Sequence, residues 1–211
     1  LARLHGDLEF TPVFPETEET SAPVIERYLP SRDYEKHNRE LKRARRFLKQ
    51  RSQKTWFEIR LSAVIDPFLE EARQLCEEWK EIELAASDSG EEVPLCFCHG
   101  DYQYHNILRQ DRGFFLVNFE KCQADGPVRD LYLLLRKLLE KSEWDAEWGR
   151  VLLAAYESVR PLKPYERQDL VYRLSYPEKL WKIVNFYYNS GKAWIPEKNQ
   201  EKLDRLLEQE A

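Results

Sequence analysis

The chain has 211 residues, of which 38 are acidic and 33 are basic, and 42% are hydrophobic. This length and apolar content can build a real core, with one compact unit as the default. The net charge of −5 gives no general reason to expect nucleic acid or an anionic membrane as a partner. No apolar run approaches the length of a membrane span, and the first ten residues lack the charged and apolar halves of a signal peptide. We therefore expect a folded protein in an aqueous, reducing compartment.

Residues 1–30 have the composition of a connecting segment. Acidic residues are spaced along this stretch, with no more than short apolar runs between them. Methionine is absent from the whole chain, so we expect further sequence upstream of Leu1. The prolines of the segment are Pro12, Pro15, Pro23 and Pro30.

A helical pattern begins at Ser31. Ser31 can cap the helix, and Asp33 and Glu35 suit its positively polarised first turn. The basic run over residues 42–51 falls where the helix dipole favours cations. A nucleic-acid interpretation of this run has less support, because no aromatic residues for base stacking interleave with it before Trp56.

Further helices are predicted from apolar residues at three- and four-residue spacing. The first begins after Pro67, and the loop-like segment 86–94 ends it. Its apolar positions are Phe68, Ala72, Leu75, Trp79 and Ile82. Beyond Pro127 the pattern is helical over residues 127–141, 144–159, 164–174, 177–189 and 197–209.

The four cysteines do not form two CxxC pairs. Cys96 and Cys98 would point to one face of a strand, which is a poor start for a tetrahedral zinc site. We predict reduced, mostly buried thiols at Cys76, Cys96, Cys98 and Cys122.

Between the helices lies a small β region. Residues 95–100 are short, apolar and bounded by Pro94 and Gly100, which predicts a buried strand. The pattern of residues 106–119 predicts a strand, a tight turn at 111–113 and a second strand.

The segment CHGDYQYHNIL, residues 98–108, spaces three polar residues as the kinase catalytic loop does. His99, Asp101 and Asn106 match the pattern H-x-D-x-x-x-x-N. In that loop the Asp orients the attacking hydroxyl and the Asn binds a metal ion. The alternative is a turn shaped by its Asp, Asn and Gly. The hairpin that follows favours a phosphotransfer site.

A second metal-binding aspartate would be expected at the end of that hairpin, where the sequence has Asn118 instead. An amide has no charge, and hard Mg²⁺ prefers carboxylate oxygen. Glu120 lies two positions later, and so on the same side of an extended strand, where it could replace the lost carboxylate. The alternative is that Asn118 completes a hydrogen-bond network in a site that no longer works.

These residues resemble a known family. HGDYQYHNIL resembles the loop of aminoglycoside phosphotransferases and choline-kinase-like enzymes, while DLYLLLRKLLEK (130–141) and residues 176–210 resemble the CotS family of endospore coat proteins. The resemblance implies an α+β, mainly helical fold: the C-terminal lobe of a protein-kinase-like fold, over residues 31–211, with a small β-hairpin region carrying the catalytic loop. The nucleotide-covering lobe would lie upstream. The seven glycines are scattered singly and form no phosphate-binding loop, so we expect no nucleotide-binding residues in this chain.

The resemblance also assigns roles by position. Asp101 would be the catalytic base, Asn106 a metal ligand, and Asn118 would occupy the place of the second ligand, with Glu120 as its substitute if the site is active. Asp130 would hold the loop by accepting backbone hydrogen bonds, and His99 would be scaffolding.

Two functions follow as hypotheses. The first is a spore coat protein with a degenerate phosphotransfer site, synthesised in the mother-cell cytoplasm, located in the spore coat and in contact with other coat proteins. The second is an active phosphotransferase acting on a hydroxyl of a small molecule, polysaccharide or coat protein. ATP and Mg²⁺ would be needed only for the second, and only with the upstream lobe. The aromatic residues from Tyr176 to Trp194 are expected mostly to pack in a core.

Overall fold

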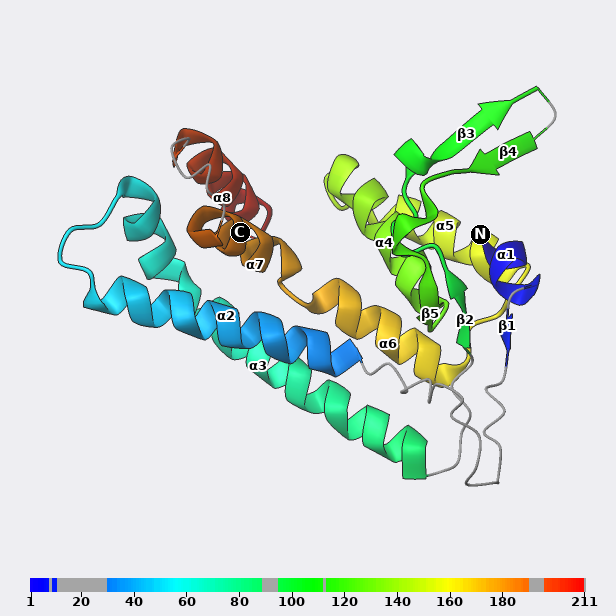
Figure 1. The fold of residues 1–211 in the computed structure, drawn as a ribbon, viewed down its shortest axis with the longest axis horizontal. Coiled ribbons are helices and arrows are strands. Elements are labelled where there is room, and N and C mark those ends of the chain that lie inside the picture. The colour runs from blue at the N-terminus through cyan, green and yellow to red at the C-terminus, as the bar shows by residue number, and fades with distance from the viewer. Residues whose placement is uncertain (8, 11–29, 89–94, 112, 190–195, 211) are drawn as a thin grey trace. The chain divides into compact units, whose positions relative to one another are not determined.

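The computed structural model describes residues 1–7, 9–10, 30–88, 95–111, 113–189 and 196–210 (Figure 1). The chain divides into two compact units. One comprises Leu1–Tyr28 and Ile82–Leu174, and the other comprises Leu29–Glu81 and Ser175–Ala211. Most of the predicted connecting segment lies outside the described residues, and its described part contains a helix and a strand that the sequence did not predict.

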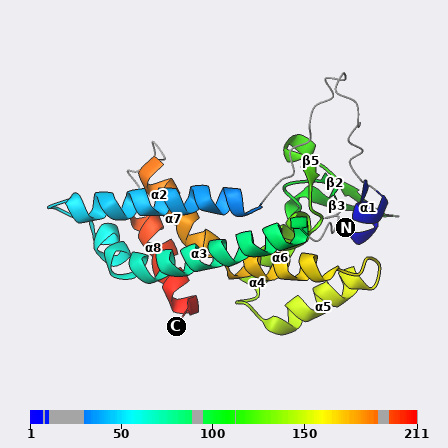
Figure 2. The ribbon, with the colours of Figure 1, turned by 90° about the horizontal axis from the view of Figure 1, so that it is seen from below.

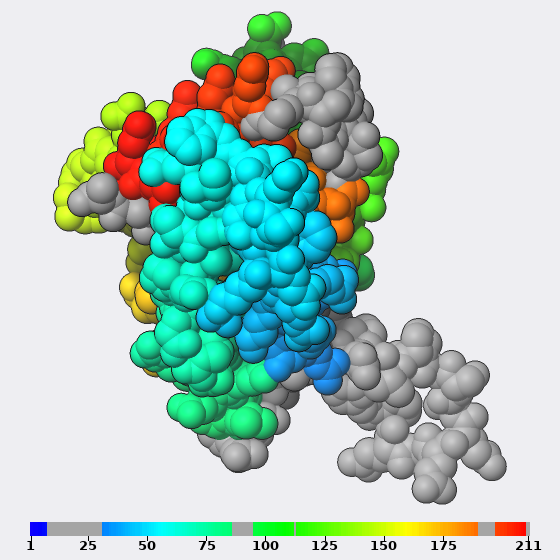
Figure 3. All heavy atoms as spheres, turned by 90° about the vertical axis from the view of Figure 1, so that its left-hand side faces the viewer, coloured from blue at the N-terminus to red at the C-terminus, as the bar shows by residue number. Residues whose placement is uncertain are grey.

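The second unit is helical. It contains α2 (Pro30–Gln50), most of α3 (Trp56–Asp88), α7 (Glu178–Asn189) and α8 (Pro196–Glu210). Helices α2 and α3 run side by side in two views (Figures 2 and 3). Their apolar faces form one core with α7 and α8, and its most deeply buried residues are Leu41, Phe57, Leu61, Leu180 and Leu203.

A buried polar chain links three segments of this unit. The Tyr176 hydroxyl donates to Asn38 Oδ1 at 2.8 Å, and Asn38 Nδ2 donates to the carbonyl of Ala72 at 3.0 Å. Tyr176 is buried, while Trp181, Tyr187 and Tyr188 pack at the edge of the core, as predicted for most of the C-terminal aromatics. Phe186 is exposed, and Trp194 lies outside the described residues.

The prediction that a helix starts after Pro67 was wrong. Helix α3 begins at Trp56 and continues through Pro67. Thr55 and Glu58 cap its start: the Glu58 carboxylate accepts from the Thr55 N–H at 2.8 Å, and Thr55 Oγ1 accepts from the Glu58 N–H at 3.3 Å. This capping box is visible in the sequence. Proline removes one helical hydrogen bond, but burial of Phe57 and Leu61 before it keeps the helix continuous.

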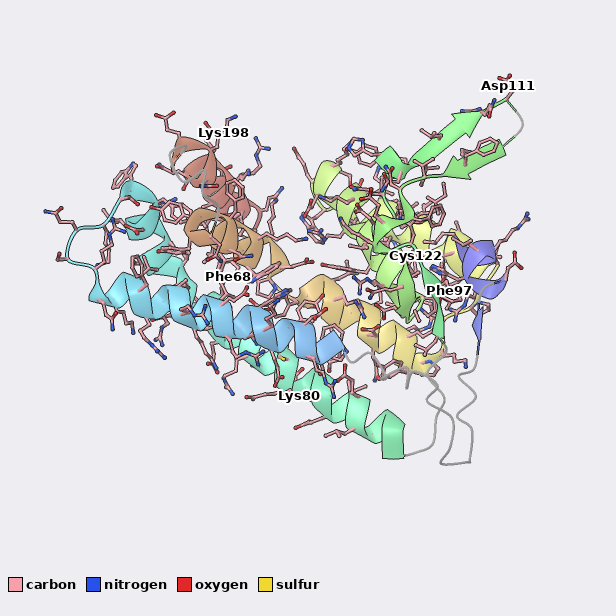
Figure 4. All side chains as sticks on the ribbon, in the orientation of Figure 1. Phe68, Lys80, Phe97, Asp111, Cys122 and Lys198 are labelled. Carbon is pink, nitrogen blue, oxygen red and sulfur yellow. The ribbon has the colours of Figure 1, made fainter. Side chains whose placement is uncertain are left out.

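The first unit contains the strands. Strand β2 (Leu95–Cys98) lies between β1 (Glu9–Phe10) and β5 (Gln123–Asp125) in an antiparallel sheet, and β3 (Ile107–Gln110) pairs with β4 (Gly113–Leu116) in a hairpin (Figure 1). Asp111 lies at the hairpin tip (Figure 4). The predicted strand after Pro94 and the pairing of two strands in a hairpin were confirmed, but β4 ends at Leu116 rather than at residue 119, and residue 112 of the predicted turn lies outside the described residues. Strand β5, which is short and largely polar, was not predicted.

Four helices complete this unit. They are α1 (Ala2–Asp7), α4 (Val128–Lys141), α5 (Ala146–Glu157) and α6 (Pro164–Ser175), and the last three match their predictions within about two residues. Ala2, Val128, Leu131, Tyr156 and Leu170 belong to their common core. Across the described residues, no helix is long and apolar enough to cross a membrane.

Candidate functional site

The loop after β2 makes a close approach that only glycine permits. Gly100 has φ +73°, and a Cβ placed on it would lie 2.1 Å from the backbone oxygen of Lys121. Glycine adopts this left-handed conformation without a steric penalty. The loop can therefore pass directly against the segment that follows the hairpin.

Asp130 holds the backbone of this loop. It lies in the first turn of α4 and is fully buried. Its carboxylate accepts hydrogen bonds from the N–H of His99 at 2.6 Å and of Gly100 at 2.9 Å. Two backbone donors that burial would otherwise leave unpaired are thus satisfied, and the shape of the loop is fixed.

His5 lies next to Asp130, and Tyr156 lies next to His5. The sequence did not predict either residue at this site. His5 Nε2 lies 3.5 Å from Asp130 Oδ2, and His5 Nδ1 is 2.8 Å from the Tyr156 hydroxyl. His5 and Tyr156 are 151 positions apart in the chain, so no local pattern could have linked them.

His99 acts as scaffolding in the structure. Its Nε2 donates to the carbonyl of Val117 at 2.8 Å, and its Nδ1 accepts from the Asp101 N–H at 3.2 Å. The ring is buried and ties the loop to the end of the hairpin. Both nitrogens are engaged, so this histidine has none left to bind a metal.

Asp101 keeps a partly exposed carboxylate. One oxygen accepts from Gln103 Nε2 and the other pairs with Lys121 Nζ, each at 3.0 Å. The side chain of Asp101 is 32% exposed and that of Lys121 is 64% exposed, so this ion pair contributes little to stability. Each carboxylate oxygen has lone pairs for a further donor. Asp101 can therefore still accept a hydrogen bond from a hydroxyl.

Asn106 and Asn118 lie together and bind each other. Asn118 Nδ2 donates to Asn106 Oδ1 at 2.9 Å, and Asn106 Nδ2 donates to the Asp101 carbonyl at 2.8 Å. Asn106 is buried. The structure thus brings Asp101, Asn106 and Asn118 into one connected group, and the Asn106 oxygen already has a donor.

The prediction that Asn118 and Glu120 lie on the same side of one extended strand was wrong. Strand β4 ends at Leu116, Asn118 is in the left-handed region (φ 66°, ψ 61°), and residues Phe119–Lys121 form a short 3₁₀ helix. The alternation of an extended strand therefore does not apply, and it gives no reason to place Glu120 on the side of Asn118. Glu120 is exposed.

The cysteines are mostly buried, as predicted. Cys76, Cys96 and Cys98 are buried free thiols and Cys122 is exposed. The hydrogen bond with Cys96, burial, and the negative charge of Asp130 together raise the pKa of the Cys98 thiol far above its usual range.

The chain is similar to known proteins in both sequence and fold. The family model described as "Phosphotransferase enzyme family" matches residues 22–167, more than half of the chain. Spore coat protein S of Bacillus subtilis (strain 168) is 32% identical over 113 residues, which cover 53% of this chain and 32% of that protein. The chain therefore spans about a third of the length of this relative.

A solved structure shows the same fold. The aminoglycoside phosphotransferase from Alicyclobacillus acidocaldarius subsp. acidocaldarius DSM 446 aligns with a TM-score of 0.73 and 20% identity, over 99% of this chain and 63% of that one. The predicted mainly helical, aminoglycoside-phosphotransferase-like fold and the resemblance to the CotS family are thus confirmed. Residues His99, Gly100 and Asp101 after β2 form what is called here the HGD loop. On the family match, the fold and the arrangement of this loop, this chain belongs to the phosphotransferase enzyme family.

Proposed function

We propose that this chain is the kinase-like part of a spore coat component whose phosphotransfer site is degenerate and which acts mainly in coat assembly or structure. The observation that carries the proposal is the hydrogen bond from Asn118 to Asn106. An ionised aspartate at position 118 could not donate this bond. Two facing oxygens would then be left, and a cation would be needed between them.

The residues at this position do not fit Mg²⁺. Both are neutral amides, and the Asn106 oxygen is engaged by the Asn118 amide. Loss of one unit charge near a divalent ion is worth on the order of several kcal/mol at an effective dielectric constant of about 20. The self-contained pair of amides stabilises the loop without a metal ion.

The similarity to Spore coat protein S supports a setting in the spore coat. Contact with other coat proteins and synthesis in the mother-cell cytoplasm are further parts of this proposal. Exposed apolar residues on the hairpin support a role in protein contacts. Leu108, Phe114 and Phe115 are 52%, 74% and 54% exposed. Leu108 and Phe115 are cross-strand partners and share one face of the hairpin, whereas Phe114 lies on the other face. Contiguous exposed apolar side chains are typical of an interaction surface.

One observation favours the alternative, an active phosphotransferase acting on a hydroxyl. The carboxylate of Asp101 is partly exposed, and its loop is held in place by Asp130. Under this alternative, Asp101 is the base, the full-length protein needs ATP and Mg²⁺, and Glu120 supplies the missing charge.

Substitution of Asn118 by Asp separates the two functions. We expect the full-length wild type to show no thermal shift with Mg²⁺ and ATP and no phosphate release. Asn118→Asp should gain a Mg²⁺-dependent shift of several degrees, because binding at 100 times Kd stabilises by about 2.7 kcal/mol. Asn189→Asp adds the same charge at an exposed end of α7 and should gain none.

Two further outcomes would decide against the proposal. Wild-type turnover that Asp101→Ala abolishes would establish the active enzyme. In sporulating cells, we expect Asp101→Ala to enter the coat as the wild type does and Phe114→Glu to enter it less, as measured by coat extraction. Loss of the Asp101→Ala variant from the coat, with the protein still folded, would show that assembly depends on the site.

A further inference from the structure

Three buried side chains of types that can bind metal ions meet in the first unit. Strand β2 carries Cys96 and Cys98, which point to the same face because they are two positions apart. Their sulfurs are 3.5 Å apart. Helix α1 brings His5 to the same place, so that one ligand atom from each residue lies within 4.8 Å of the others. All three side chains are fully buried.

One ring nitrogen of His5 has a hydrogen-bond partner and the other has none. One ring nitrogen, Nδ1, is held by the Tyr156 hydroxyl at 2.8 Å. The other, Nε2, is buried and forms no hydrogen bond. A partner on the second nitrogen that fixes the ring is typical of metal-ligating histidines. This nitrogen faces Asp130 Oδ2 at 3.5 Å, and a metal ion would be a second partner for it.

The sulfur geometry suits metal coordination. With a Zn–S distance of about 2.3 Å, sulfurs 3.5 Å apart subtend about 100° at the ion, close to a tetrahedral angle. The two sulfurs are thus already at a separation that one ion can bridge. Metal binding would replace the contact between them and the contacts of Cys98 Sγ with the carbonyls of Asp125 at 3.7 Å and Gly126 at 3.3 Å. From the sequence, a pair of cysteines on one face of a strand was a poor start for a tetrahedral zinc site. The structure adds His5 to this pair, which the sequence did not predict.

The surrounding charge also favours a cation. Asp130 is fully buried and lies 3.5 Å from His5 Nε2, and its negative charge opposes thiolates but attracts a positive ion. A divalent ion with two thiolates has no net charge, so Zn²⁺ and the three groups can be buried together without an unpaired charge. Cu⁺ with two thiolates would keep one negative charge, so the charge balance favours Zn²⁺ over Cu⁺.

We propose that His5, Cys96 and Cys98 bind one thiophilic metal ion, Zn²⁺ or Cu⁺. Imidazole and thiolate are the ligands that both ions accept. As each sulfur–metal bond forms, the thiol releases its proton to solvent, so two protons leave for each ion bound. The ion would join α1 to β2, next to the carboxylate that holds the HGD loop. The proposed ligands are not the residues of the degenerate phosphotransfer site, but Asp130 lies beside His5 and also holds the loop of that site.

The test uses the reduced full-length protein after removal of metal by a chelator. It is titrated without oxygen against Zn²⁺, Cu⁺ and, as a spectroscopic substitute for Zn²⁺, Co²⁺. We expect one equivalent to bind, the melting temperature to rise by several degrees, and Co²⁺ to give a thiolate-to-metal absorption band. Cys96→Ser and Cys98→Ser should each lose the band and the shift. Cys122→Ser, a change at an exposed thiol, should retain both.

Absence of binding by all three ions would overturn the proposal. So would binding that survives in the Cys96→Ser/Cys98→Ser double variant, because the ion would then lie elsewhere. If the Cys96 and Cys98 variants do not fold, the Co²⁺ band still decides. A band that persists in a Cys76→Ser/Cys122→Ser protein does not come from these two thiols and supports Cys96 and Cys98, and a band that disappears there contradicts the assignment.

Discussion

Replacement of Asp130 by Ala is expected to lower the free energy of unfolding by about 3–5 kcal/mol. The fully buried carboxylate accepts from the N–H groups of His99 and Gly100, and it lies beside His5. Alanine would leave two buried donors without an acceptor, and the loop that carries Asp101 would lose its anchor. Urea denaturation of the full-length protein measures the loss, and hydrogen exchange of the two amides shows whether the loop opens.

The control for this substitution is Asp145→Ala. Asp145 is also an aspartate at a helix start, where its exposed side chain accepts from the Glu147 N–H at 2.9 Å. Loss of such a cap is expected to reduce stability by about 1 kcal/mol. If Asp130→Ala were no more destabilising than this control, the carboxylate would not hold the loop.

Replacement of Gly100 by Ala is expected to reduce the free energy of unfolding by about 2–5 kcal/mol. Two effects add. Alanine is strained at φ +73°, and its Cβ would lie 2.1 Å from the Lys121 backbone oxygen, so the two segments must move apart. The ion pair between Lys121 and Asp101 joins the same two segments and should weaken as they move apart.

Gly6→Ala is the matched control, because Gly6 lies in α1 and a Cβ there meets nothing within 4 Å. In a helix, alanine is favoured over glycine by roughly 0.5–1 kcal/mol, so this variant should be unchanged or slightly more stable. Urea denaturation and hydrogen exchange at residues 99–101 provide the comparison. Equal stability of the two variants would mean that the loop adapts to a side chain at position 100.

These two predictions separate the shape of the loop from its chemistry. The anchor at Asp130 and the close approach at Gly100 keep the loop in place whether or not phosphate is transferred. The change lies at Asn118, where an amide donates to Asn106. In the function that we propose, the scaffold of the phosphotransferase fold is kept while its metal-binding position is neutral.

The sequence predicted features that depend on local backbone geometry. Neighbours a few positions apart set these features, which are the spacing of His99, Asp101 and Asn106, the predicted turn at 111–113, and the helical periods beyond Pro127. The same reasoning was wrong at Pro67, where the expectation that proline begins a new helix was given more weight than the helix-start signal at Thr55 and Glu58. At Pro67 the helix continues because its apolar face is buried, and the capping box at Thr55 and Glu58 gave a signal for its true start.

The sequence by itself determined the family, the order of most helices, and which residues form the loop. Only the tertiary structure decided how that loop is held and what surrounds it. The backbone is left-handed at Asn118, so the alternation of side chains along an extended strand does not continue to Glu120. The predicted role of Glu120 as a substitute metal ligand depended on that alternation. His5 reached Asp130 and the thiols of β2 from a segment far away in the chain. The physical reason is that spacing records contacts within a turn or a strand, whereas contacts between distant segments depend on which surfaces pack together.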